Sequence, residues 1–138
     1  MTRTDETADE SLLQKKWGPA LNGGFVVAPA ALFRFQHELD ISDGEVVVLM
    51  NLLMSWWNPD ELPFPRASTL AKRMGVSQRT VLRHLDRLEE KDLVRRVRDE
   101  RSDDYRRGLT RYDLSGIVAR LKDLGEVFHP SRQREHLS

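Results

Sequence analysis

The side chains best suited to binding another molecule lie in one basic stretch of the chain, Arg66 to Arg111. This stretch holds 14 basic and 8 acidic residues, a net charge of +6, whereas residues 1–65 hold 4 basic and 10 acidic residues, a net charge of −6. A polyanion is expected to bind the basic stretch, although a solvated charged face is the alternative interpretation of such a run. Within it stand Gln78, Arg79 and Arg83. Arginine donates a fork of hydrogen bonds to guanine O6 and N7, and glutamine pairs similarly with adenine.

A helix from Ser77 to Lys91 is needed to present these side chains together. Ser77 is a suitable N-cap, and Val81, Leu85 and Leu88 follow at the i, i+4, i+7 spacing of a buried stripe. With that stripe inward, Gln78, Arg79 and Arg83 point outward as candidate base contacts. Candidate phosphate contacts are the nearby cations and hydroxyls Arg66, Ser68, Ser77, Thr80, His84 and Arg87.

A second short helix is predicted from Ser68 to Met74, immediately before the first. Gly75 between them accepts the positive φ that a tight turn requires, and Ala71 is small enough for the two helices to cross closely. The sequence therefore predicts a helix-turn-helix.

The helix after Ser42 has the strongest local start signal. Ser42 and Glu45 form a capping box, and Ile41 and Val46 fit a hydrophobic staple. The helix is expected from Asp43 to Trp56 or Trp57 and is apolar on nearly every face, which indicates a core helix or one that also packs on a second subunit.

The remaining pattern predicts a mainly α fold with a small β-hairpin. Alternating residues predict the hairpin, whose tip, Asp99 to Arg107, is wholly polar. The other expected elements are a helical turn at Leu12–Trp17, a strand or extended segment at Phe25–Ala28, a helix at Ala30–Glu38, strands at Leu93–Arg98 and Gly108–Asp113, and a helix at Gly116–Leu124 that Ser115 caps and Gly125 closes.

The stretch from Ser68 to Leu88 resembles the helix-turn-helix of winged-helix regulators. Its pattern is Ala-x3-Gly-Val-Ser-x2-Thr-Val followed by a leucine stripe. Phe25 to Leu114 as a whole is similar to a helix-turn-helix family of phage and plasmid proteins, which includes small regulators and replication initiators. The further matching signs are Phe25-Val-Val-Ala-Pro29, the apolar helix after Ser42, Phe64-Pro65 and Arg111-Tyr-Asp-Leu114.

The resemblance implies a winged helix-turn-helix, with two departures. Asp92 stands where such families usually have glycine, and Asp tolerates the left-handed conformation better than most residues. The expected wing tip carries four carboxylates, so Arg106, Arg107 and Arg111 are the expected phosphate contacts of the wing instead of the tip itself.

Other classes of site have little support. The chain has no cysteine, its four histidines lack metal-ligand spacing, and no glycine-rich phosphate loop is present. No apolar stretch resembles a signal peptide or a membrane span. We therefore expect no enzyme activity, cofactor or membrane contact, and a cytoplasmic location. The expected organisation is a disordered arm at 1–11, the winged helix-turn-helix with an N-terminal extension at 12–125, and a flexible tail at 126–138.

The leading hypothesis is a sequence-specific double-stranded DNA-binding protein that acts as a transcriptional repressor. A homodimer is expected, because two reading helices ~34 Å apart match one turn of DNA. One alternative is a plasmid or phage replication initiator. The other is a winged-helix module that docks proteins without binding DNA.

Overall fold

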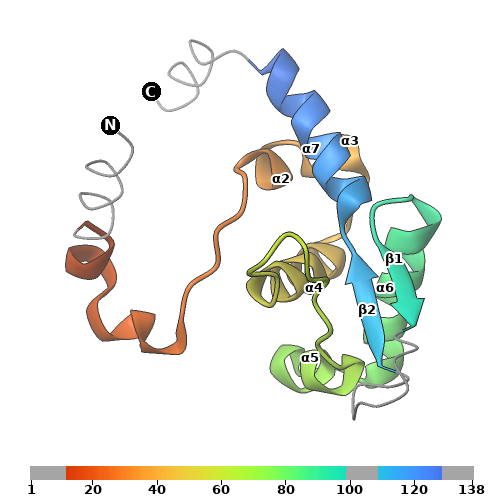
Figure 1. Ribbon diagram of the computed structural model, residues 1–138, viewed down its shortest axis with the longest axis horizontal. Coiled ribbons are helices and arrows are strands. Elements are labelled where there is room, and N and C mark those ends of the chain that lie inside the picture. The colour runs from red at the N-terminus through yellow and green to blue at the C-terminus, as the bar shows by residue number, and fades with distance from the viewer. Residues whose placement is uncertain (1–11, 99–108, 129–138) are drawn as a thin grey trace.

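The computed structural model of the chain describes residues 12–98 and 109–128. It is mostly helical with one antiparallel hairpin, which confirms the predicted fold class (Figure 1). After a helical turn at residues 12–17 come the 3-10 helix η1 (Gly18–Gly23), α2 (Ala31–Arg34), α3 (Gln36–Leu39), α4 (Asp43–Met54), α5 (Ala67–Met74), α6 (Gln78–Glu90), β1 (Arg95–Arg98), β2 (Thr110–Asp113) and α7 (Ser115–Val127).

Helix α4 lies at the centre and begins as its sequence predicts. The Ser42 hydroxyl accepts from the Glu45 N–H at 3.2 Å, and the Glu45 carboxylate accepts from the Ser42 N–H at 3.4 Å, which confirms the capping box. The helix ends at Met54, earlier than expected, and Trp57 is exposed beyond it. Its buried residues join a single core with α2, α5, α6, α7 and the hairpin.

The α5–turn–α6 unit also follows its local signals. Gly75 has a φ of +68° in the left-handed region, and the Ser77 hydroxyl accepts from the Thr80 N–H at 3.1 Å. Val81, Leu85 and Leu88 are each at most 1% exposed, so the predicted stripe is the buried face of α6.

A partly buried ion pair joins the end of α6 to the start of α4. Lys91 Nζ lies 2.8 Å from Glu45 Oε1 and also donates to the Asp40 carbonyl oxygen. Burial alone would raise the pKa of Glu45, but the hydrogen bonds from Lys91 and Ser42 outweigh it and lower that pKa. The carboxylate is therefore charged at neutral pH and holds the two helices together.

The hairpin follows α6 after a left-handed residue. Asp92 has a φ of +58°, as expected for the residue that replaces glycine there. In the register Arg96 faces Tyr112, and the Tyr112 N–H donates to the Pro63 carbonyl at 2.9 Å, which attaches the segment before α5 to the hairpin. The strands are shorter than predicted, and the predicted polar tip falls outside the described residues.

The N-terminal part departs further from prediction. The helix expected at Ala30–Glu38 is divided into α2 and α3 at Phe35, whose ψ of +26° is not helical. Phe25–Ala28 is extended and forms no strand. In Figure 1 the segment before α2 runs outside the helical cluster, and η1 has no buried residue.

Helix α7 begins and ends differently from the prediction. Ser115 is its first residue and not its cap; the Asp113 carboxylate instead accepts from the Ser115 N–H at 2.9 Å. Gly125 lies within the helix, which continues to Val127, so residues 126 and 127 are not part of a tail. The expected arm at 1–11 and most of the expected tail lie outside the described residues.

Replacing the two glycines of α7 with alanine is expected to have opposite effects on the stability of the protein. A Cβ on Gly116 would overlap the backbone carbonyl of Asp92, whereas a Cβ on Gly125 would meet no atom within 4 Å. We expect Gly116→Ala to destabilise the protein by about 1–3 kcal/mol through overpacking. Gly125→Ala should stabilise it by about 0.5–1 kcal/mol, the usual gain of alanine over glycine inside a helix. Urea denaturation measures the free energy of unfolding of both variants. Equal changes in the two variants would contradict the close packing described at Gly116 and the open space described at Gly125.

Candidate nucleic-acid interface

The exposed face of α6 has a cationic first half. Arg79 and Arg83 are exposed on the side of the helix away from its buried stripe, and Gln78 is exposed at the edge of that stripe, one turn before Val81. The acidic residues Asp86, Glu89 and Glu90 come later in the helix. The end that reaches base edges first in a helix-turn-helix is therefore the positive one.

Arg79, Arg83 and Arg87 form no ion pair with any residue in the described ranges. Their charges are therefore available to an incoming anion. The acidic residues near them are partly neutralised, because Arg96 of β1 lies 2.5 Å from Asp86 Oδ1 and 2.6 Å from Glu89 Oε1.

Arg96 also fixes the hairpin to α6. Its backbone N–H donates to Glu89 Oε2 at 3.0 Å and its Nε donates to Glu89 Oε1 at 3.2 Å. These hydrogen bonds from Arg96 lower the pKa of Glu89. The same contacts thus attach the hairpin to α6 and neutralise part of the negative charge in the second half of the helix.

A groove of about 290 Å³ lies between α6, the start of α5 and the hairpin. Gln78 and Leu82 line one side, and Arg66 and Thr110 lie on others. Leu82 is 39% exposed and was not among the residues predicted to contact DNA. The signal was present, since Leu82 is the one leucine of α6 outside the buried stripe.

Residues 39–94 match the helix-turn-helix domain family. The match covers 56 of the 138 residues and includes α4, α5 and α6. With the hairpin that follows α6, the chain has the winged helix-turn-helix fold, in which the second helix of the motif lies in the DNA major groove.

Solved structures with a similar fold include the N-terminal domain of the DnaD protein from Geobacillus kaustophilus HTA426. That domain is 24% identical, with a TM-score of 0.56, over 88% of this chain and 96% of that one. A lower TM-score of 0.44 relates the chain to S. aureus MepR, solved in complex with DNA, at 24% identity over 75% of this chain and 81% of that one. Bacillus subtilis YusO is 18% identical, with a TM-score of 0.44, over 99% of this chain and 89% of that one. No curated protein sequence matches the chain.

Most of the remaining predicted phosphate contacts lie on or next to α5 and α6. Arg66, Ser68 and Arg87 are exposed. The hydroxyls of Ser77 and Thr80 lie 3.0 Å apart at the start of α6, where Ser77 also caps the helix. Arg106 and Arg107 fall outside the described residues.

Two predicted phosphate contacts do not fit their positions. The His84 ring packs directly against Gly44 of α4, and its Nδ1 is buried with no hydrogen-bond partner in the described part of the chain. Arg111 is only 6% exposed; it donates to the Leu62 carbonyl at 2.8 Å and its guanidinium lies 4.5 Å from the centre of the Phe64 ring. Both side chains hold elements of the fold together, so they are corrections to the predicted interface.

Other kinds of site find no support in the described residues. These residues contain no group of three or more histidine, aspartate or glutamate side chains that could hold a metal ion. Among the described helices, none has the length and apolar character to cross a bilayer.

The Glu89–Arg96 ion pair should make the stability of the protein depend on pH. A lowered pKa in the folded state means that the contribution of Glu89 to stability is complete above its ordinary pKa of 4.5 and is lost as the pH falls below it. We expect Glu89→Gln to cost about 0.2–1 kcal/mol at pH 7, the range for solvent-screened pairs. The difference from wild type should shrink as the pH falls below that value.

Thermal denaturation between pH 7 and pH 3 measures this difference. Glu90→Gln is the matched control, because Glu90 is exposed on the same helix and forms no ion pair in the described ranges. A Glu90→Gln profile equal to that of Glu89→Gln would contradict the prediction.

Proposed function

We propose that the protein is a sequence-specific double-stranded DNA-binding regulator that inserts α6 into the major groove and represses transcription by occupying its site. The carrying observation is that Arg79 and Arg83 are exposed and without ion pairs in the described ranges, opposite a stripe that is buried. The helix-turn-helix match over residues 39–94 supports this role.

Base recognition is assigned to the first half of α6. Arg79 and Arg83 suit guanine and Gln78 suits adenine, since each presents two hydrogen-bonding groups to a base edge. Phosphate contacts surround this centre. They are assigned to Arg66, Ser68, Ser77, Thr80 and Arg87, with Arg106 and Arg107 from the wing.

A homodimer is part of the proposal, because two copies of α6 spaced ~34 Å apart would read two half-sites on one face of DNA. The exposed apolar residues Trp17, Phe25 and Val27 before α2 are the proposed subunit contacts. They are 49–79% exposed in the single chain, which leaves apolar surface for a second copy to cover.

Arg83→Ala tests the reading helix. A DNA site is first selected from a random duplex pool, and binding is then titrated at two salt concentrations. We expect the variant to lose about 1–3 kcal/mol on the selected site and to discriminate less between bases. Wild-type affinity should fall steeply with salt, because phosphate contacts release counterions.

The matched control is Arg120→Ala, which removes an exposed arginine from α7 at the same cost in net charge. It should bind the selected site nearly as well as wild type. If wild type and both variants bound every duplex equally and weakly, the proposed function would be wrong and protein docking would be the better account.

We expect Leu82 to contact a thymine next to the base that Gln78 binds. It is the exposed leucine of α6 and lines the groove with Gln78, one helical turn earlier. Apolar side chains contact the C5-methyl group of thymine in the major groove. Replacing the contacted thymine with deoxyuridine removes only that methyl group. We expect this replacement to weaken wild-type binding and to leave Leu82→Ala unaffected; equal losses in both proteins would exclude the contact.

A further inference from the structure

The extended segment before α2, Phe25–Ala28, has the burial pattern of a strand. Phe25 and Val27 are 49% and 79% exposed, whereas Val26 and Ala28 are half-buried, and Ala28 packs on the core. Alternation with a period of two is typical of a strand that has one face toward the protein. Valine and phenylalanine also favour strands.

The backbone of this extended segment has no partner among the described residues. Its four N–H and four C=O groups form no hydrogen bond there, although Gly24 before it and Leu32 after it each donate one. A row of unpaired backbone groups on an extended chain is a template for a strand from another chain. The segment therefore has an open edge that suits one more strand.

The leading segment, residues 12–24, is also without cover in the single chain. None of its residues is buried, and Leu12 and Trp17 are 61% and 51% exposed. Figure 1 shows it running away from the helical cluster. Ordering a residue costs about 1–2 kcal/mol of backbone entropy, which contacts must offset. Within one chain, the leading segment lacks the burial that would hold it in place.

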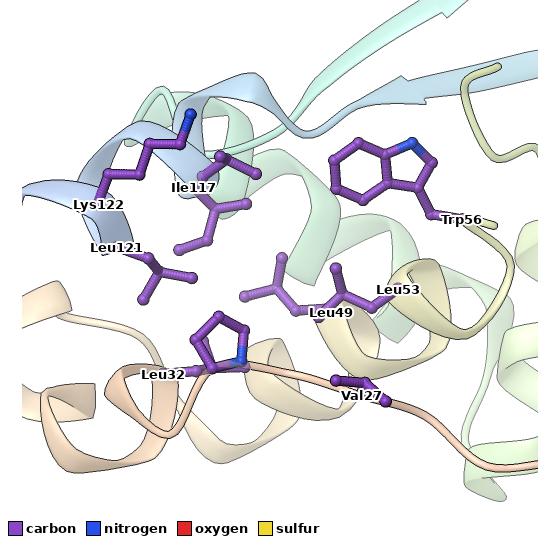
Figure 2. A pocket seen from close by; sticks show the side chains of 10 residues that line it. Val27, Leu32, Leu49, Leu53, Trp56, Ile117, Leu121 and Lys122 are labelled. Carbon is purple, nitrogen blue, oxygen red and sulfur yellow. The ribbon is translucent and has the colours of Figure 1, made fainter. Parts of the chain in front are cut away.

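An apolar cavity lies beside the extended segment, bordered by α4, α7 and α2 (Figure 2). Its volume is about 350 Å³, and nine of the ten residues that line it are apolar. Leu32, Leu49 and Ile117 line its floor and are at most 3% exposed. Val27 and Pro29 line it from the chain before α2. The cavity therefore offers a large apolar side chain a place next to the open edge.

We propose that a second copy of the chain pairs its extended segment antiparallel with this one, and that its leading segment then covers the cavity. Antiparallel pairing of a segment with itself is two-fold symmetric, so both copies form the same contacts. The chain that leads into the second copy's strand then continues past Pro29 toward α2 and α7, which border the cavity. The second copy's Trp17 is the side chain assigned to fill it. This pairing deepens the homodimer of the proposed function and rests on that proposal, but it requires no DNA.

The exposed apolar area is large enough for a stable dimer. Leu12, Trp17, Phe25 and Val27 are each about half exposed or more, and together they offer roughly 400 Å² per chain. Covering them hides a similar area on the other copy. Two reciprocal contacts therefore bury about 1,600 Å², which is the usual size of a stable interface.

Sedimentation velocity on the full chain measures the dimer. We expect Val27→Glu and Trp17→Ala each to raise its dissociation constant roughly tenfold or more, because the first places like charges across the strand pair and the second empties the cavity. The matched controls are Val127→Glu and Trp57→Ala, whose side chains are 72% and 76% exposed and lie outside the cavity lining. Both controls should dimerise like wild type. Thermal denaturation establishes that each variant is folded.

Cysteine cross-linking locates the strand pair. The chain has no cysteine, so a single introduced cysteine can join only to its own copy. Residues of the same face lie opposite each other in a strand pair, which centres the pair on Val26 or Val27. The residue at the centre then faces itself within the roughly 4.4–6.8 Å Cα separation of a disulfide. We expect Val26→Cys or Val27→Cys to form a disulfide-linked dimer under mild oxidation, and Val127→Cys to form none.

A monomeric wild type would overturn the proposal, and so would the absence of a cross-link at both valines. Equal effects of Val27→Glu and Val127→Glu, or of Trp17→Ala and Trp57→Ala, would also overturn it. The DNA titration separates this proposal from the proposed function. A cross-linked dimer that binds no selected DNA would contradict DNA reading and leave the pairing standing, whereas specific DNA binding by a monomer would contradict the pairing alone.

Discussion

The placement of α6 depends on one buried carboxylate. Glu45 is 1% exposed, and a carboxylate in that position is costly unless its oxygens accept hydrogen bonds from charged or oriented donors. Here the donors are the Ser42 N–H, which starts α4, and the Lys91 amine, which follows α6. One side chain thus closes the first turn of α4 and fixes the far end of α6 to it. The stripe of Val81, Leu85 and Leu88 sets the rotation of α6, and so determines which residues face solvent.

A second charged side chain, Arg96, attaches the hairpin to α6. Arg96 holds Asp86 and Glu89, so the hairpin is fixed to α6 by the residues that would otherwise repel a phosphate backbone. These three ion pairs leave the solvent-facing arginines of α6 without acidic partners in the described ranges. The chain is neutral overall, yet the first half of α6 is positive, and Arg96 pairs with two of the three acidic residues in its second half.

The features that sequence predicted are those decided within a few residues. The Ser42–Glu45 capping box, the Gly75 turn and the Ser77 cap each depend on neighbours in the chain, and all three are present. His84 and Arg111 were misassigned because their surroundings come from distant segments: Gly44 for one, and Leu62 and Phe64 for the other. Ser115 was misassigned by a narrower margin, since the helix begins at Ser115 itself and the carboxylate of Asp113, two residues earlier, accepts from the Ser115 N–H. The outward residues of α6 remain predictions, because exposure shows that they are available and not what they touch.

Helix α4 shows how far an apolar pattern can be interpreted. A helix that is apolar on nearly every face indicates burial on several sides, and the sequence offered a core or a second subunit as the reason. The structure adds a third cause. One side of α4 packs on α5 and α6, while Leu49 and Leu53 line a cavity that α7 and α2 enclose. Apolar residues are required on that side whether the cavity is empty or filled, because they close it from below. The same helix therefore separates this cavity from α6.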